Sequence, residues 1–361
     1  MRFLYALGLI VLSSCSTSTN TQLDQKNENY QFFSTCHSAS LEEWLKEYQQ
    51  ELGTIDSALT LANRLPEHAA EWYRGTAYFM KARASAHLGK VAEARENILF
   101  ALNHSFRNDG LIRIDSIMLN VIGSQWLDSI VAVWVPIHRT LQKQWLPQPI
   151  ILNRALHIHR RKPALIIALH GGNGSYEEFA THFSELPDEI NAVIAFPAGL
   201  RRISYVANSW PEETTLSDSF LLNAIDSIKR TIDCDTSQVF LMGYSQGAAT
   251  SLGLALRHPG HFRGVVLFSG FTFDSYSDSL LLEAAKHQIS FYALCGEHPE
   301  SGFRTTIKNL SRLCTTFGIR FHYEEHSGML HEVPLDAEKD VVTAIHWIQS
   351  GGATSENVTY R

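Results

Sequence analysis

One serine stands in a setting that could turn it into a nucleophile. Ser245 is the centre of Gly243-Tyr244-Ser245-Gln246-Gly247, which follows the apolar run 239–242 and precedes small residues that can begin a helix. A serine hydroxyl is a weak nucleophile, and a sharp strand-to-helix turn presents it to a base and to oxyanion donors. Glycine two residues before and after it removes side chains that would clash in so tight a turn. The pattern predicts a nucleophile elbow.

A glycine-rich loop is the second feature that could do chemistry. The segment His170-Gly171-Gly172-Asn173-Gly174-Ser175 directly follows the apolar run 164–169. Backbone N–H groups in such a loop can point at a developing oxyanion. We expect the oxyanion hole to use the N–H of Gly172 and that of Gln246, the residue after the nucleophile. The spacing fits neither of the common phosphate-binding glycine motifs, so a phosphate site is disfavoured.

The general base is predicted to be His331. It comes late in the chain, after the last predicted strand, as the order serine, acid, histidine requires. Its role would be to take the Ser245 proton and return it to the leaving alcohol. His326 is a nearby rival, but the sequence His331-Glu332-Val333-Pro334 favours His331.

The elements that must position these residues alternate between strand and helix. Apolar runs typical of buried parallel strands are separated by amphipathic helical segments. This order predicts a mainly parallel sheet covered by helices. Strands are expected at 150–159, 164–169, 192–196, 239–242, 264–268, 289–294 and 319–324, and helices at 216–231, 246–257, 303–317 and 336–349.

This ordered series resembles the α/β-hydrolase fold. Within it the chain is similar to the phospholipase/carboxylesterase and polyhydroxybutyrate-depolymerase-like branch, over roughly residues 145–350. The motifs that carry the resemblance are Leu169-His170-Gly171-Gly172, Phe196-Pro197-Ala198-Gly199, Ser209-Trp210, the Ser245 elbow, Phe268-Ser269-Gly270 and Leu330-His331-Glu332-Val333-Pro334. The resemblance implies a doubly wound α/β sheet and a serine esterase that works through an acyl-enzyme, with no cofactor and no metal.

The triad acid is where the sequence departs from the family. The family pattern after the next-to-last strand is Gly-x-x-Asp, but here Pro299 stands at the aspartate position. Glu300, one residue further on, is the first candidate, and Glu297 and Asp274 are the others. Loss of the acid would cost about 10⁴-fold in rate, so this departure keeps a weak or inactive enzyme open as an alternative.

The N-terminus reads as an export signal. Met1-Arg2 precedes an apolar segment that ends in Leu12-Ser13-Ser14-Cys15, which resembles a bacterial lipobox. The resemblance implies cleavage before Cys15 and lipid modification of that cysteine, so that the protein would be anchored to a membrane in the bacterial cell envelope. Residues 1–15 are therefore predicted to be the signal peptide and 16–40, rich in Ser, Thr, Asn and Gln, a polar tether.

A helical domain is predicted over residues 41–144. The stretch 72–102 resembles one degenerate tetratricopeptide-type hairpin, with small alanines where two helices cross. It could bind a protein partner, or it could be a helical spacer. The spacer is favoured, because no array of three repeats is visible in the sequence. Pro147 and Pro149 mark the boundary to the hydrolase domain, 145–350, which is followed by a tail, 351–361.

Three function classes remain open on the sequence alone. An esterase acting on small-molecule esters is favoured, and a degenerate binding or scaffold protein and a serine peptidase on the same fold are the alternatives. The formal net charge of −7 gives no basic footprint for nucleic acid. Trp210 would line the substrate pocket or lie at the edge of the core. The cysteines beyond Cys15 show no metal pattern and are expected to be buried free thiols.

Overall fold

The computed structural model describes the chain from residue 31 onward. Residues 41, 44–45, 105, 107–111, 114, 143–149, 156–160, 205, 212–213, 271–275, 298–302, 352–357 and 361 are outside the description. Cys15 and residues 16–30 of the predicted tether also lie outside the described residues.

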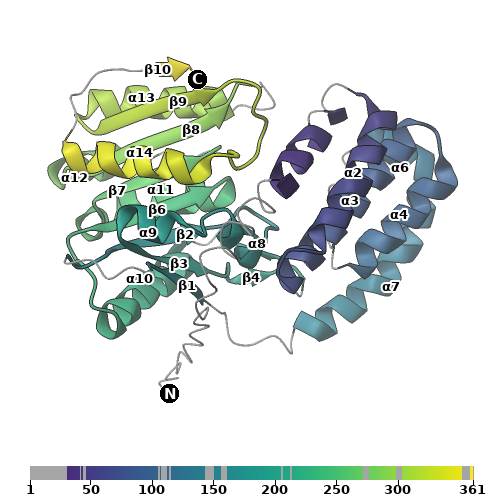
Figure 1. The fold of residues 1–361 in the computed structure, drawn as a ribbon, viewed down its shortest axis with the longest axis horizontal. Helices are drawn as coiled ribbons and strands as arrows, with labels where there is room; N and C mark the ends of the chain where they lie inside the picture. Colours follow the sequence, from purple (N-terminus) through teal and green to yellow (C-terminus); the bar gives the residue numbers. More distant parts are fainter. Residues whose placement is uncertain are drawn as a thin grey trace.

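Helices make up the first part of the described chain and lie beside a sheet-containing part (Figure 1). They are residues 31–40, α2 (Tyr48–Ala62), α3 (Glu67–His87), α4 (Val91–Asn103), α6 (Ser116–Ile122) and α7 (Ser124–Gln142). Helices α3 and α4 pack as a hairpin through fully buried alanines, among them Ala82, Ala86 and Ala94. Small residues at a crossing let two helix backbones approach closely.

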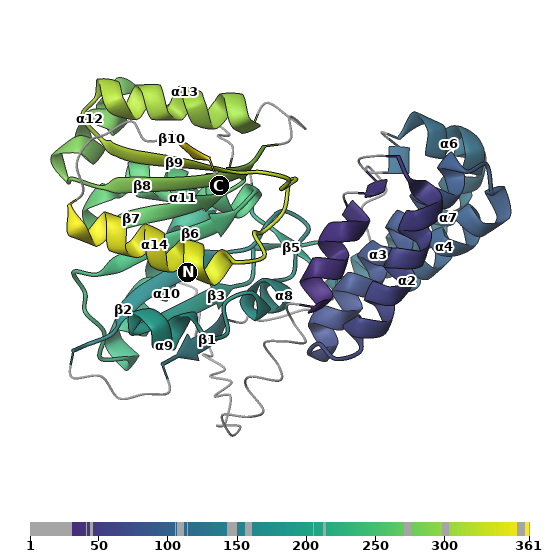
Figure 2. The same cartoon turned by 45° about the horizontal axis from the view of Figure 1, so that its top comes forward.

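The predicted tether is wrong over its last ten residues, because 31–40 form a helix. Phe32 and Ala39 are buried, and Phe32 packs edge-on against Tyr73 of α3 with ring centroids 4.5 Å apart. Phe32, Phe33, Cys36 and Ala39 recur at helical spacing and form one apolar stripe. The stripe could not be recognised in the sequence, because it is short and polar residues surround it. In Figures 1 and 2 this purple helix lies on the side of the helical part that faces the sheet.

The second part is built on a twisted, mostly parallel sheet. Its strands are β1 (Ile150–Arg154), β2 (Ala164–Leu169), β3 (Ala192–Pro197), β6 (Val239–Tyr244), β7 (Gly264–Phe268), β8 (Ser290–Gly296), β9 (Arg320–His326) and β10 (Val358–Tyr360). The order across the sheet is β1-β3-β2-β6-β7-β8-β9-β10, and β1 is the antiparallel strand. A separate short pair joins β4 (Arg201–Arg202) to β5 (Asn208–Ser209). The predicted fold class is confirmed.

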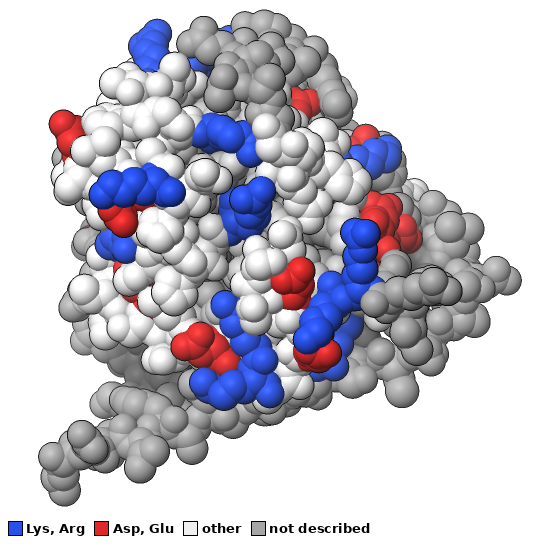
Figure 3. Space-filling model, turned by 90° about the vertical axis from the view of Figure 1, so that its left-hand side faces the viewer, with Lys and Arg blue, Asp and Glu red and all other residues white. Residues whose placement is uncertain are grey.

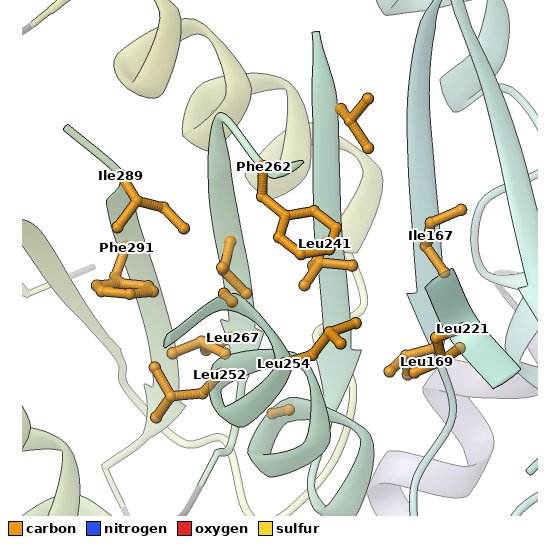
Figure 4. Close-up of a cluster of buried hydrophobic side chains, with 14 of the residues drawn as sticks. Ile167, Leu169, Leu221, Leu241, Leu252, Leu254, Phe262, Leu267, Ile289 and Phe291 are labelled. Atoms are coloured by element: carbon orange, nitrogen blue, oxygen red, sulfur yellow. The ribbon is translucent and has the colours of Figure 1, made fainter. Parts of the chain in front are cut away.

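Helices cover both faces of this sheet and create two cores (Figure 2). One face carries α10 (Thr214–Thr231), α11 (Gln246–Arg257), α12 (Asp278–Lys286) and α13 (Phe303–Thr316), and the other α8 (Tyr176–Thr181), α9 (Leu186–Ile190) and α14 (Ala337–Ser350). Along β6, Val239 and Leu241 face the first core while Phe240 and Met242 face the second. Figure 4 shows Leu252 and Leu254 of α11 packed towards Leu241 and Leu267. Each such buried side chain contributes roughly 1.5–3 kcal/mol to folding.

Two local differences from the sequence prediction concern short elements. Residues 351–361 were expected to be a tail, but Val358–Tyr360 pair in parallel with β9. Three residues are too few to show a strand period, so the pattern could not reveal this strand. Helices α8, α9 and α12 were also not predicted, because each has nine residues or fewer.

The cysteines and the surface charges are as the sequence predicts. Cys36, Cys234, Cys295 and Cys314 are free thiols, and the last three are buried. On the face drawn in Figure 3, Lys and Arg are interspersed with Asp and Glu. Among the described residues no single helix has the length and apolarity to cross a bilayer; α6 and the first part of α7 reach them only together, across an 87° bend.

Candidate active site

Ser245 sits at a strained turn between β6 and α11. Its backbone angles are φ 52° and ψ −116°, a region that non-glycine residues rarely adopt. Such strain is typical of functional positions. Gly247 is required by packing, since a Cβ there would overlap the backbone carbonyl of Leu169. The turn therefore holds the Ser245 hydroxyl at the carboxyl end of the sheet, as the elbow pattern predicts.

His331 lies against this hydroxyl. Its Nε2 is 2.9 Å from Ser245 Oγ, across 86 residues of sequence. The Tyr244 hydroxyl donates to the His331 carbonyl oxygen at 2.7 Å, which ties the histidine loop to the elbow. Burial lowers the pKa of His331 to about 4, and the nearby Glu332 carboxylate opposes this effect only in part. At neutral pH the imidazole is therefore uncharged and its Nε2 can accept the serine proton.

The rival His326 is placed elsewhere, at the end of β9. Its Nε2 lies 3.9 Å from Glu324 Oε1 and 3.8 Å from Asp340 Oδ2. The structure thus brings His331, and not His326, to Ser245.

Of the three candidate acids, Glu297 alone lies within the described residues. Glu300 and Asp274 lie outside the described residues. Glu297 Oε2 accepts hydrogen bonds from Ser327 Oγ at 2.7 Å and from the Gly328 N–H at 3.3 Å. These bonds hold the turn between β9 and His331, so Glu297 shapes the histidine loop.

The predicted oxyanion donors lie side by side. A Cβ on Gly172 would come within 2.9 Å of Gln246 Oε1, so this loop lies close against the elbow. The Gln246 side chain is itself fixed, because it accepts from the Trp210 N–H at 3.0 Å and donates to the Trp210 carbonyl at 3.1 Å. Gln246 begins α11, where the N–H groups have no acceptor within the helix and the helix dipole favours negative charge.

His170 has a positioning role that sequence reasoning missed. The Gly199 N–H donates to its Nε2 at 3.0 Å, so the ring proton must be on Nδ1, which donates to the Gly171 carbonyl at 2.7 Å. Burial lowers the pKa of His170 to about 4, which keeps it neutral. A neutral ring that accepts on one side and donates on the other fixes the peptide before Gly172. The signal in the sequence was a histidine directly before two glycines at a strand end.

Trp210 supports the same loop from the core. It is fully buried, and its Nε1 donates to the His170 carbonyl at 2.9 Å. Of the two interpretations offered by the sequence, the structure places Trp210 in the core and not in a pocket. Ser209, beside it, accepts from the Asn173 N–H at 2.8 Å.

The helical part contacts the oxyanion loop directly, which the sequence did not predict. Trp72 of α3 donates from Nε1 to the Asn173 carbonyl at 3.0 Å. His68, also on α3, lies 2.7 Å from Glu177 at the start of α8. His37 of helix 31–40 lies 2.7 Å from Glu332, the residue after His331. Both loops of the candidate site are therefore held by the helical part.

Comparison with known proteins agrees with this architecture. The family model described as Phospholipase/Carboxylesterase matches residues 207–342, a range that includes the Ser245 elbow and His331. The chain has the α/β-hydrolase fold.

Individual relatives are distant and partial. Feruloyl esterase B of Talaromyces stipitatus is 28% identical over 118 residues, covering 31% of this chain and 33% of that protein. Proline iminopeptidase of Thermoplasma volcanium is 24% identical over 107 residues, covering 30% and 35%. An uncharacterized protein of Bacillus cereus has a similar structure, with a TM-score of 0.49 and 16% identity over 86% of this chain and 99% of that one. The chain spans about a third or less of the length of the curated relatives it matches.

Proposed function

We propose that the protein is a serine hydrolase of the carboxylesterase type, with Ser245 as nucleophile and His331 as general base. The observation that carries this proposal is the 2.9 Å contact between His331 Nε2 and Ser245 Oγ at a strained elbow beside a glycine loop. Nucleophile and base within hydrogen-bond reach, with oxyanion donors alongside, is the arrangement that acyl transfer needs.

The geometry supports a two-step reaction. Ser245 Oγ attacks the ester carbonyl while its proton moves to His331 Nε2, and the N–H groups of Gly172 and Gln246 stabilise the oxyanion. The tetrahedral intermediate collapses, the imidazolium gives its proton to the leaving alcohol, and an acyl-enzyme remains on Ser245. Water, deprotonated by His331, then releases the carboxylic acid and restores the serine.

We propose Glu300 as the acid that orients His331, with Glu297 and Asp274 as the alternatives. The support is the chain order serine, acid, histidine alone. Replacement of the true acid by its amide should lower kcat by about 10⁴-fold, so parallel kinetics of E300Q, E297Q and D274N would identify it.

The decisive experiment combines active-site labelling with kinetics. A small fluorophosphonate should label Ser245, and Ser245→Ala should lose both the label and about 10⁴-fold or more in kcat on p-nitrophenyl esters. Since the two residues act as a unit, Ser245→Ala/His331→Ala should be no slower than either single variant. The exposed Ser279→Ala is the matched control and should behave as wild type. A wild-type protein that is neither labelled nor active on any ester would favour the scaffold alternative, and turnover of peptide amides over esters would favour a peptidase.

We also propose that the protein is lipid-anchored through Cys15 in the cell envelope. The support is the charged start, the short apolar run and the Leu-Ser-Ser-Cys ending. Incorporation of a labelled fatty acid in wild type but not in Cys15→Ser would test it. The use of the helical hairpin for a protein partner stays a prediction.

A further inference from the structure

A cavity of about 290 Å³ lies between the helical part and the oxyanion loop. The helical part contributes aromatic and apolar side chains from helix 31–40 and α3: Phe32, Phe33, Trp72, Tyr73 and Met80. Helix 31–40 lies on the side of the helical part that faces the sheet (Figures 1 and 2). The hydrolase part contributes Gly171, Gly172, Phe179, Tyr244, Val333 and Leu335. Neither part encloses this space alone.

The cavity borders the candidate catalytic residues. Gly171 lines it, and a Cβ on Gly171 would lie 3.5 Å from the Cβ of Ser245. Tyr244 and Glu332 also line it, and these are the chain neighbours of Ser245 and His331. A group bound in the cavity would therefore lie beside the residues that flank Ser245 and His331 in the chain.

The polar side chains of the cavity wall are already paired with protein groups. His37 lies 2.7 Å from Glu332, and His182 lies 2.9 Å from Glu178. The His182 ring also stacks on Phe33 with centroids 3.8 Å apart, and Trp72 Nε1 is bonded to the Asn173 carbonyl. Since these groups satisfy one another, what the wall offers a ligand is mainly aromatic and aliphatic surface. An anionic group would lose its hydration here and would meet the Glu178 and Glu332 carboxylates.

We infer that this cavity receives an uncharged, apolar group of the ester, and that the helical part thereby sets the substrate class. The inference rests on the proposed function. The volume of the cavity is roughly twice the ~150 Å³ of an apolar cavity that holds benzene. It therefore suits a group on the scale of two aromatic rings or a medium-length alkyl chain. If the cavity takes an alkyl chain, kcat/KM should be at least about tenfold higher for octanoyl than for acetyl esters. The reason is that each methylene group buried in apolar surroundings lowers the free energy of the transition state.

A cavity-filling variant tests the inference. Thr76 of α3 lines the cavity, and its hydroxyl bonds the Trp72 carbonyl one turn back at 3.2 Å. Thr76→Phe should lower the octanoate-to-acetate ratio of kcat/KM by at least about tenfold, because the ring occupies the space. Thr60→Phe is the matched control: Thr60 makes the same bond to Asp56 at 3.0 Å on the exposed side of α2 and should keep the wild-type ratio.

A second variant works in the opposite direction and keeps the test valid if Thr76→Phe does not fold. Met80→Ala enlarges the cavity and should move the preferred chain to a longer one. Two substrate series, one varying the acyl chain and one varying the alcohol, show which side of the ester the cavity takes, since only that series should respond.

The outcomes separate this inference from the proposed function. If fluorophosphonate labels Ser245 in all variants and neither Thr76→Phe nor Met80→Ala alters selectivity in either series, the cavity is not the substrate site and the inference is overturned. If the folded wild type is not labelled and cleaves no ester, the proposed function fails and the inference falls with it.

Discussion

At the scale of single residues, the site is built from two neutral histidines with different tasks. His331 meets the nucleophile through Nε2 at 2.9 Å, whereas His170 uses both ring nitrogens to hold backbone groups. Burial lowers the pKa of both to about 4. His170 is therefore a positioning residue, whereas His331 Nε2 lies within proton-transfer distance of Ser245.

The pKa of His331 predicts the acid limb of the pH–rate profile. The base works only when neutral, so kcat/KM should fall as the pH drops through the pKa of His331. Because burial depresses that pKa, the fall is expected near pH 4 and well below the ordinary histidine value of about 6.5. Hydrolysis of a p-nitrophenyl ester between pH 3.5 and 9, with folding checked by circular dichroism, measures it. An acid limb of kcat/KM with its midpoint at pH 6.5 or above would contradict the prediction.

At the scale of elements, the site depends on how closely β2, β6 and α11 meet. Gly247 lies in the first turn of α11, at the end of β2, and the carbonyl oxygens of Leu169 and His170 occupy the space of any Cβ. The elbow and the oxyanion loop are therefore one packed unit.

Replacement of Gly247 should break this unit. Gly247→Ala forces the backbone of α11 away from β2, which we expect to lower the free energy of unfolding by about 1–3 kcal/mol or more and to abolish esterase activity. Gly53→Ala, in α2, is the control. There an added Cβ would have no atom within 4 Å, and alanine favours the helix by roughly 0.5–1 kcal/mol. Urea denaturation and ester kinetics of both variants check this, and equal stability of the two would refute it.

At the scale of the whole molecule, the helical part acts as one wall of the candidate site. Helix 31–40 reaches the histidine loop through His37 and Glu332, and α3 reaches the oxyanion loop through Trp72 and Asn173. These contacts join segments that are 295 and 101 residues apart in the chain. The two parts are thus joined at both loops of the candidate site.

The contact between His37 and Glu332 should make this link pH-dependent. The hydrogen bond to Glu332 raises the pKa of His37, against a smaller effect of burial. A raised pKa means that the stabilisation is fully present below the unfolded value near 6.5 and is lost as the pH rises through the folded value. Both side chains are about a quarter exposed, so the coupling should not exceed roughly 1 kcal/mol.

A double-mutant cycle measures this coupling. His37→Gln, Glu332→Gln and the double variant, compared by urea denaturation at pH 5.5 and pH 9, should give a larger coupling energy at pH 5.5. Coupling that is absent at both values, or larger at pH 9, would show that the pair does not hold the two parts together.

The sequence by itself determined the sheet and the chemical groups. Continuous apolar runs such as 164–169 and 264–268 are buried on both faces wherever they lie, so local pattern was sufficient to place β2 and β7. The glycines around Ser245 predicted the turn, because only that spacing relieves its crowding. These are local properties that each segment carries with it.

Only the tertiary structure decided what surrounds the serine. The neutral tautomer of His170 depends on Gly199, 29 positions away, and the Asn173 carbonyl is held by Trp72, 101 positions away. The sequence predicts a tether at residues 31–40 because their short apolar stripe stabilises a helix only when α3 and the histidine loop supply a surface that buries it. Contacts between distant segments have no signature in local spacing, so the cavity and its walls became visible only in the folded chain.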